Sequence, residues 1–244
     1  LIKKNSNYYS TMKVQVLLPK IFNFTFTYNL DHKKNYKKGD VVEIPFGSKK
    51  EIGVIWNNTN SIPKNIKIKN INKKIENFSI NQKLIDFIEW FSMYNMVPRG
   101  LALKMCIGNG RNLFKKKDQI KKPKKIKVTK YSLNKEQEDS LKYLENVKGK
   151  FNVSVLQGTT GSGKTLVYFE RIKKIIEENK QALVLLPEIF LTNQFKSRFE
   201  EFFGFPPAVW HSRITPKNKR IILKGIIQNK IKLIIEARSS LMLP

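Results

Sequence analysis

The chain has 244 residues, of which 47 are Lys or Arg and 19 are Asp or Glu, so its formal net charge is +28. Apolar residues make up 41% of the chain, as in ordinary globular proteins, which excludes wholesale disorder. One cysteine and two histidines are too few for a disulfide framework or a Cys/His zinc site, so a metal would need oxygen ligands. Neither a membrane span nor a signal-peptide pattern is present, and a cytoplasmic location without membrane contact is expected.

The excess of positive charge predicts a polyanionic partner. Each phosphate that Lys or Arg neutralises releases counterions, so nucleic acid is the first candidate. The alternative is coding bias in an A/T-rich genome, since only seven of the 47 basic residues are Arg. Such bias explains the Lys-to-Arg ratio more readily than it explains the excess over acidic residues.

A small, mainly-β domain is predicted over residues 12–110. From Val14 to about Ile75, apolar residues come in short runs or alternate with polar ones. Turn residues interrupt this pattern at Gly39-Asp40 and at Gly47-Ser48. These features are typical of short strands joined by turns.

A helix is expected to close the β domain, and a basic linker is expected to follow it. Ser79 and Gln82 have the spacing of a capping box, and the next apolar residues share one helical face: Leu84, Phe87, Ile88 and Phe91. Residues 111–132 are rich in Lys, contain Pro123 and have few core formers. Such charge runs are usually linkers, although a contact with nucleic acid is the alternative.

The pattern changes after Leu133 to strands that alternate with helices. Apolar strand candidates lie at residues 153–156, 182–186, 208–210 and 231–235. Helical faces are predicted between them, one marked by Tyr168, Ile172, Ile175 and Ile176, and a mixed one by Leu191, Gln194, Phe195, Arg198 and Phe202. Repeated β-α units predict an α/β fold with a parallel sheet over residues 133–244.

Residues 158–165, GTTGSGKT, match the eight-residue phosphate-loop pattern between a predicted strand and a predicted helix. Glycines let backbone N–H groups turn toward phosphates, and the following helix start adds favourable partial charge. Lys164 is expected to reach the terminal phosphates, and the Thr165 hydroxyl to bind magnesium. The predicted nucleotide contacts are Gly158, Thr160, Gly161, Ser162, Gly163, Lys164 and Thr165. The alternative is a Gly-rich turn that binds nothing.

Gln137 lies about twenty residues before this loop and has two interpretations. Its amide could recognise adenine through paired donor and acceptor groups. Equally, Asn134 and Gln137 have the spacing of a capping box at a helix start. Position alone does not choose between the two.

Polar turns are predicted to follow three of the strands at one edge of the parallel sheet. They contain Thr192, which could hold a DNA phosphate, then His211, and Arg238 as a phosphate clamp. Helix capping is the alternative for Thr192, and plain surface charge for Arg238.

These motifs together resemble the PriA family of primosomal proteins, superfamily 2 DNA helicases that restart stalled replication forks. The segments that carry the resemblance are GDVVEIPFG at 39–47, LNKEQ at 133–137, QGTTGSGKT at 157–165, LLPEIFLTNQ at 185–194, HS at 211–212 and ARSSLMLP at 237–244. Their combination is far more specific than the phosphate loop alone.

The resemblance implies roles for residues in both domains. The β domain would bind the 3′ end of a leading strand, with a pocket formed by Phe26, Thr27, Tyr28 and Gly47. Thr27 stands where an acidic residue of family members reads the terminal hydroxyl, and a core aromatic with a turn glycine is the alternative. The second domain would be a RecA-like helicase lobe, in which Gln137 reads adenine, ATP and Mg²⁺ bind at the loop, and Thr192, His211 and Arg238 follow the DNA.

Several features of the family are not expected in this sequence. The linker is too short for the winged-helix domain that usually separates the two domains. The acidic magnesium box, the zinc-binding cysteines and the second motor lobe do not occur in these 244 residues. Phosphoryl transfer depends on such groups, so ATP binding with little or no turnover is expected.

The leading hypothesis is the N-terminal portion of an ATP-dependent DNA helicase that assembles primosomes. Its expected partners are forked DNA, other primosome proteins and single-stranded DNA-binding protein. An alternative is a non-enzymatic module that binds fork DNA and keeps a vestigial nucleotide site. A P-loop kinase of small substrates would leave both the charge and the β domain unexplained.

Overall fold

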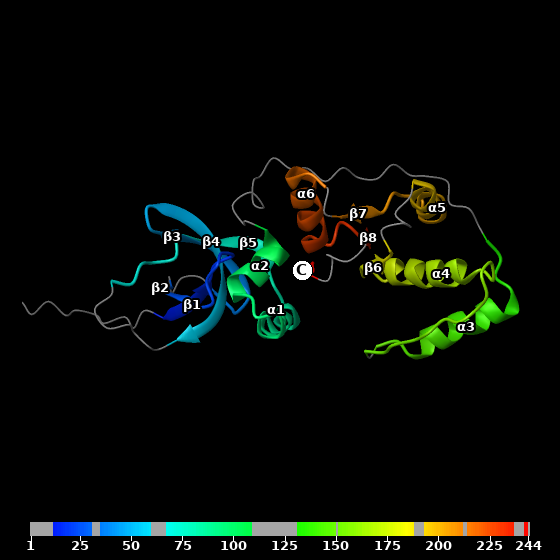
Figure 1. Ribbon diagram of the computed structural model, residues 1–244, viewed down its shortest axis with the longest axis horizontal. Coiled ribbons are helices and arrows are strands. Elements are labelled where there is room, and N and C mark those ends of the chain that lie inside the picture. Colours follow the sequence, from blue (N-terminus) through cyan, green and yellow to red (C-terminus); the bar gives the residue numbers. More distant parts are fainter. Residues whose placement is uncertain are drawn as a thin grey trace, which may run out of the picture. The chain divides into compact units, whose positions relative to one another are not determined.

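The computed structural model describes residues 12–30, 35–59, 67–108, 131–149, 151–187, 193–211, 214–236 and 242–243. Most of these residues form two compact units, one within residues 12–108 and one within residues 131–236 (Figure 1). The predicted basic linker lies outside the described residues except for Tyr131 and Ser132, so its boundaries stay predictions.

The first unit contains a five-stranded antiparallel sheet with the strand order β2-β1-β4-β3-β5. Its strands are β1 (Lys13–Leu17), β2 (Phe26–Asn29), β3 (Asp40–Phe46), β4 (Lys49–Thr59) and β5 (Lys73–Ser79). Both predicted breaks are confirmed as turns, one at Gly39 before β3 and one at Gly47 between β3 and β4. Both glycines have positive φ angles, +89° and +59°, which favour glycine.

Alternating side chains give the sheet its core, because successive residues of a strand point to opposite faces. In β1, Val14 and Val16 are buried, whereas Lys13 and Gln15 are only partly covered. The core cluster consists of Val14, Val16, Leu18, Tyr28, Leu30, Val42, Ile44, Ile55 and Ile71. The alternation therefore predicted which residues are buried here.

Two helices complete this unit (Figure 1). The predicted helix is confirmed as α1 (Gln82–Tyr94), and α2 (Arg99–Ile107) follows it. The predicted cap at Ser79 is wrong, because Ser79 is the last residue of β5 and pairs with Asp40. Asn81 caps α1 instead, and its side chain accepts a hydrogen bond of 2.8 Å from the Leu84 N–H.

The second unit is an α/β structure with a parallel sheet in the order β6-β8-β7, which confirms the predicted fold class. The strands are β6 (Ala182–Leu185), β7 (Ala208–Trp210) and β8 (Leu233–Glu236). The helices are α3 (Lys135–Asn146), α4 (Lys164–Glu177), α5 (Asn193–Phe203) and α6 (Pro216–Ile227). Three of the four predicted strands are thus present within one or two residues of their expected positions.

Helices cover both sides of this small sheet (Figure 1). The apolar face of α4 packs with α5 against β6 and β8, and aromatic rings dominate this core. Phe169 lies 4.5 Å from Phe199 and 5.1 Å from Phe202 between ring centroids. Helix α6 lies on the other side of the strands. Aromatic burial of this kind stabilises a sheet too small to form a core by itself.

The strand predicted at residues 153–156 is wrong. Residues 151–159 form no strand, and the side chains of Phe151, Val153 and Val155 are 97%, 78% and 88% exposed. An apolar run becomes a strand only when its backbone N–H and C=O groups find a ladder partner. Among the described residues, β6, β7 and β8 pair only with one another.

Candidate nucleotide and nucleic-acid sites

The predicted phosphate loop forms a turn that leads directly into α4. Gly161 and Gly163 have φ angles of +87° and +80°, a conformation that side chains with a Cβ rarely adopt. The Ser162 N–H donates to the Thr159 carbonyl at 3.2 Å and closes the turn. Gly163 is the last residue before the helix. The first N–H groups of α4 therefore border the loop, as an anion site at a helix start requires.

Lys164 points back into this loop. Its Nζ donates to the carbonyl of Gly158 at 2.6 Å and to that of Thr159 at 2.7 Å. The ammonium group is thereby held among the loop residues, where a bound phosphate would compete for it. Thr165, the predicted magnesium ligand, is the second residue of α4 and is half-buried. The backbone turn of the loop and the positive charge of Lys164 are therefore compatible with a bound nucleoside triphosphate.

The capping-box interpretation of Gln137 is confirmed, and its contact with adenine stays a prediction. Its backbone N–H donates to Asn134 Oδ1 at 2.9 Å, and its Oε1 accepts from the Asn134 N–H at 3.0 Å, which forms the capping box of α3. Its Nε2 also donates to the Ser162 carbonyl at 3.1 Å. An amide has two N–H donors and two acceptor lone pairs, and these bonds use one of each. The other pair matches the donor and acceptor on the N6/N7 edge of adenine, so capping does not exclude base recognition.

The contact between Gln137 and the loop is tight. A Cβ atom on Gly163 would lie 2.3 Å from Gln137 Nε2, closer than real Cβ atoms approach a neighbour. The side chain of Gln137 therefore lies directly against Gly163 and joins the start of α3 to the phosphate loop by its hydrogen bond to Ser162. The sequence predicted both residues as nucleotide contacts, but only the fold shows that they touch each other.

The predicted sheet edge is present, although its residues are only partly described. In the ladder, Leu185 and Trp210 both lie opposite Glu236, so the three strands end level with one another. His211 follows β7 at this edge and is half-buried. Thr192 and Arg238, predicted in the turns after β6 and β8, lie outside the described residues.

In the first unit, strand alternation separates the three predicted pocket residues of β2. Phe26 and Tyr28 lie on the core face, opposite Val16 and Val14 of β1. Thr27 lies on the other face, opposite Gln15, and is half-buried. Tyr28 is only 5% exposed, so its ring belongs to the core. Phe26, which is half-buried, is the aromatic ring of β2 that can contribute to a surface site.

Phe26 belongs to a cluster of four phenylalanine rings that the sequence reasoning did not single out. Its ring centroid lies 5.0 Å from Phe22, 5.1 Å from Phe24 and 5.1 Å from Phe46. Phe46 directly precedes Gly47, whose Cβ position has no atom within 4 Å. The cluster therefore joins Phe26 to the open tip of the β3–β4 hairpin. The alternating aromatics of residues 22–26 were the available sequence signal.

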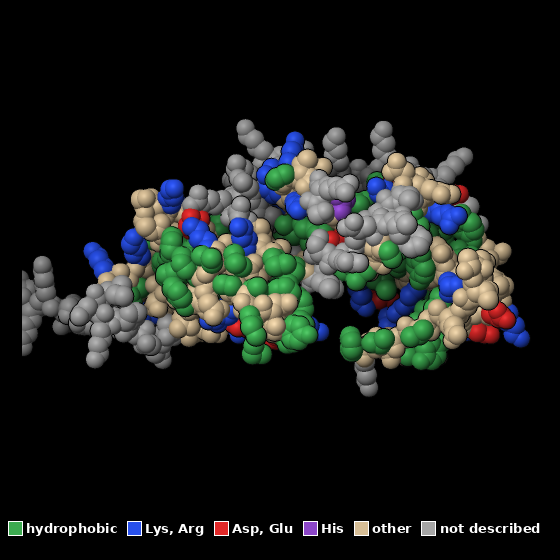
Figure 2. Space-filling model, in the orientation of Figure 1, with side chains coloured by type: hydrophobic (Ala, Val, Ile, Leu, Met, Phe, Trp, Pro, Cys, Tyr) green, Lys and Arg blue, Asp and Glu red, His purple; other side chains and the backbone are tan. Residues whose placement is uncertain are grey.

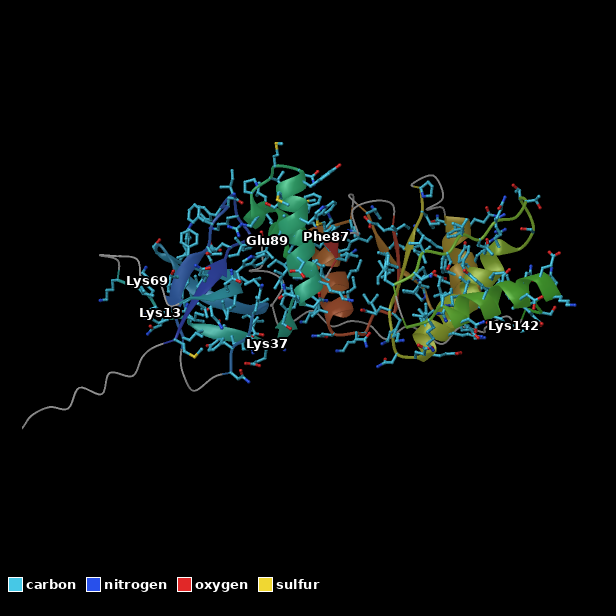
Figure 3. All side chains as sticks on the ribbon, turned by 90° about the horizontal axis from the view of Figure 1, so that it is seen from below. Lys13, Lys37, Lys69, Phe87, Glu89 and Lys142 are labelled. Atoms are coloured by element: carbon cyan, nitrogen blue, oxygen red, sulfur yellow. The ribbon has the colours of Figure 1, made fainter. Side chains whose placement is uncertain are left out.

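Lys69 is a further residue that the sequence reasoning missed. Its Nζ makes a long contact of 3.5 Å with the Gly47 carbonyl, and its own carbonyl accepts from the Asn29 N–H at 3.0 Å. Lys13 pairs with Asn29 in the ladder, and both lysines lie at the same end of the unit (Figure 3). In a chain so rich in Lys, no local pattern marks these two. The fold places the cation of Lys69 beside the hairpin tip.

Burial also determines the ionisation of Tyr28. Removal of its ring from water raises the pKa of the phenol from 10.0 to about 12. Its hydroxyl donates to the Pro45 carbonyl at 3.1 Å, two residues before Gly47. Tyr28 is therefore a neutral donor whose hydrogen bond to Pro45 stabilises the end of β3 next to the hairpin tip.

Basic side chains are visible over both units, with few acidic ones among them (Figure 2).

The described residues contain no group of three or more His, Cys, Asp or Glu side chains that could hold a metal ion. In the same residues, no helix is long and apolar enough to cross a membrane.

Comparisons with known proteins agree with this arrangement. Residues 13–108 match the family described as the 3′ DNA-binding domain of PriA, and residues 130–243 match the family described as the res subunit of type III restriction enzymes. The chain is 35% identical over 238 residues to the replication restart protein PriA of Rickettsia felis, an alignment that covers 94% of this chain. Over both units, the chain is similar to proteins named replication restart protein PriA.

Other relatives align over shorter regions of the chain. The protein of the same name from Helicobacter pylori strain J99 is 38% identical over 120 residues, 49% of this chain and 19% of the relative. That of Bacillus subtilis is 40% identical over 92 residues, 38% of this chain and 11% of the relative. The chain spans about a third of the Rickettsia felis relative, 35% of its length, and corresponds to its N-terminal portion.

Proposed function

We propose that this chain binds the 3′ end of a DNA strand at a replication fork through its first unit and ATP through its second, as part of a replication-restart helicase. The observation that carries the proposal is the succession, in one chain, of a unit that matches a 3′ DNA-binding domain and an α/β unit with a phosphate loop. Replication restart is the function named for the relatives that align with 94% of the chain.

The aromatic cluster and the neighbouring Lys69 support the DNA-binding role. A ring that is half-exposed, such as Phe24 at 56%, offers a face on which a base can stack. Base–aromatic stacking contributes roughly 1–3 kcal/mol per base. Lys69 beside Gly47 supplies a cation for a backbone phosphate. The net charge of +28 adds affinity for any nucleic acid, so specificity has to come from this site.

The phosphate loop and Gln137 support the nucleotide-binding role. Gly158 to Thr165 would hold the triphosphate, Lys164 its terminal phosphates and Thr165 a magnesium ion. The remaining donor and acceptor of Gln137 would select adenine over guanine, whose O6 replaces an amino group. ATP supplies the free energy with which such helicases move along a strand.

A second candidate is the same pair of binding sites without turnover. It is favoured by the exposed segment 151–157, because the phosphate loop is anchored to the unit by α4 and Gln137 but not by a strand before it. ATP would then bind with little hydrolysis. DNA-stimulated hydrolysis that Lys164→Ala abolishes would exclude this candidate. Other primosome proteins and single-stranded DNA-binding protein remain proposed partners under either candidate.

The deciding experiment is fluorescence anisotropy of the full chain on forked DNA at near-physiological salt, where the generic attraction is weakened. A fork with a free leading-strand 3′-hydroxyl is compared with one that carries a 3′-phosphate. Tighter binding of the hydroxyl end would support end recognition. Equal affinity with a steep salt dependence would contradict it, since only generic charge attraction would remain.

A further inference from the structure

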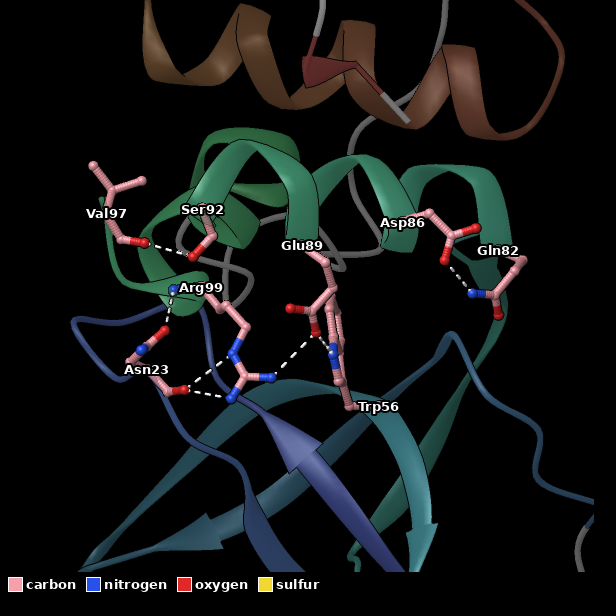
Figure 4. Close-up of polar contacts among 8 residues, drawn as sticks. All are labelled: Asn23, Trp56, Gln82, Asp86, Glu89, Ser92, Val97 and Arg99. Atoms are coloured by element: carbon pink, nitrogen blue, oxygen red, sulfur yellow. Dashed lines mark hydrogen bonds and ion pairs between the residues drawn. The ribbon is translucent and has the colours of Figure 1, made fainter. Parts of the chain in front are cut away.

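Arg99 makes a set of contacts that the proposed DNA and nucleotide sites do not include (Figure 4). Its Nε and one terminal nitrogen donate to the Asn23 carbonyl at 3.0 and 2.5 Å. Its other terminal nitrogen forms an ion pair of 3.1 Å with Glu89 Oε1. Its backbone N–H donates to Asn23 Oδ1 at 3.2 Å. One residue at the start of α2 thereby holds a turn that lies 76 positions earlier in the chain.

The acceptor Glu89 is itself held by the core. Glu89 Oε1 accepts a hydrogen bond of 2.5 Å from the indole N–H of Trp56, whose side chain is only 1% exposed. Trp56 lies in β4, in the middle of the sheet order. The network therefore runs from a buried sheet residue through α1 to Arg99 and to the turn at Asn23. Each of these side chains has a partner that fixes its orientation.

The backbone around Gly100 holds the same turn. The Gly100 N–H donates to the Phe22 carbonyl at 2.9 Å. A Cβ on Gly100 would lie 2.1 Å from the Lys20 carbonyl oxygen, 2.5 Å from that of Leu18 and 2.9 Å from that of Phe22. Carbonyl oxygens thus crowd the start of α2, where the helix dipole favours negative charge. Residues 18–23 are pressed against this helix end.

This turn carries two rings of the phenylalanine cluster. Phe22 and Phe24 flank Asn23, and Phe22 lies 5.0 Å from Phe26 and 5.7 Å from Phe46. A rotation of the turn would move both rings away from Phe26 and from the hairpin tip at Gly47. The position of the Asn23 carbonyl therefore decides the shape of the aromatic cluster.

We propose that Arg99 is a positioning residue for the DNA-end site: it holds the turn at Asn23 so that Phe22 and Phe24 complete the aromatic cluster around Phe26. This role rests on the proposed function of that cluster. Three of the five N–H groups of its guanidinium already donate to protein oxygens, so the side chain is held by the turn and by α1. Its planar fork directs donors to Asn23 and Glu89 in a fixed geometry, which the compact ammonium group of a lysine does not reproduce.

The test uses the full chain with Arg99→Gln, Arg99→Lys and the matched control Lys104→Gln. Lys104 is exposed on the same helix, so its replacement removes the same charge away from the turn. The ratio of affinities for the 3′-hydroxyl and the 3′-phosphate fork is measured for each variant. We expect Arg99→Gln to lower this ratio by about tenfold, the effect of one charge-assisted contact. Lys104→Gln should weaken both forks equally.

Hydrogen–deuterium exchange without DNA gives a second readout. Arg99→Gln should accelerate amide exchange in residues 20–28, Arg99→Lys should do so nearly as much, and Lys104→Gln should leave it unchanged. Unchanged exchange in Arg99→Gln, or full rescue by Arg99→Lys, would overturn the proposal. If the wild-type chain shows no preference between the two ends, the proposed function fails, while the exchange data still decide whether Arg99 holds the turn.

Discussion

The two candidate sites differ in how the chain holds them. In the first unit, Phe26 and Phe46 lie in strands that pair along the sheet, and Gly47 lies at the tip of a closed hairpin. In the second unit, the phosphate loop is followed by α4 with its buried Phe169, but the segment before it lies outside the sheet. The strands of its own unit hold the first site, whereas the second site is held mainly by the helix that follows it.

This difference shows where each site gets its geometry. The ladder register determines the aromatic site, because a slip of one residue would turn Phe26 away from the core face. The phosphate loop depends on two positive φ angles, on the start of α4 and on the contact with Gln137. Changes in the first unit should therefore act mainly on folding, and changes at the loop mainly on binding.

The largest expected effect compares two glycines of the first unit. Gly39→Ala places a Cβ 2.1 Å from the Ile80 carbonyl oxygen and strains a φ of +89°. The free energy of unfolding should therefore fall by more than ~2 kcal/mol. Gly47→Ala meets open space and should cost only about 1 kcal/mol for its positive φ. Urea denaturation followed by circular dichroism measures both. Similar losses for the two variants would contradict the packing at Gly39.

The next effect concerns nucleotide affinity in the second unit. Lys164→Ala should weaken ATP binding by roughly ten- to a hundredfold, the loss of a charge-assisted contact, with little change in stability. Isothermal titration calorimetry measures the affinity, and Lys142→Ala, an exposed lysine on α3, is the control for charge. If both variants bind ATP equally well, the loop is not the nucleotide site.

A smaller effect links the stability of the first unit to alkaline pH. Because burial raises the pKa of Tyr28 to about 12, its contribution to stability is complete below pH 10.0 and is lost as pH rises through 12. Tyr28→Phe removes the hydrogen bond to Pro45 and should lower the free energy of unfolding by about 1 kcal/mol at neutral pH. Between pH 10.0 and 12, the variant should lose less stability than the wild-type chain, because it has no phenol to ionise at this position. Phenolate absorbance during an alkaline titration checks the pKa. A Tyr28 that ionises near pH 10 would contradict its burial.

The smallest effect links the second unit to acid. Hydrogen bonds from Lys148 and Lys180 lower the pKa of Glu178 from 4.5 to about 2. The stabilisation is therefore present above pH 4.5 and is lost as pH falls toward 2. In Glu178→Gln, the melting temperature should fall slightly less steeply between pH 4.5 and pH 2 than in the wild-type chain. The difference is small because exposed ion pairs contribute little to stability. Identical acid limbs in both proteins would show that these pairs do not form in solution.

Much of the fold was predictable because local patterns suffice for it. Alternation in β1 and β2, the turns at Gly39 and Gly47, and the apolar face of α4 all follow from residue spacing. The cap of α1 was misplaced, since Ser79 and Asn81 are both good caps and only the ladder between β5 and Asp40 shows where the strand ends. The prediction of a strand at 153–156 was wrong for a related reason, because the pairing of one strand with another depends on residues far away in the sequence.

The sequence by itself determined the two-unit organisation, the phosphate loop and its resemblance to the PriA family, because these depend on residue types at fixed spacing. Only the tertiary structure decided which residues share a site. It placed Gln137 on the phosphate loop, Lys69 beside Gly47, and Arg99 on the turn at Asn23. These contacts join residues 22 to 76 positions apart in the chain, and such distances are bridged by packing and strand register rather than by any local pattern.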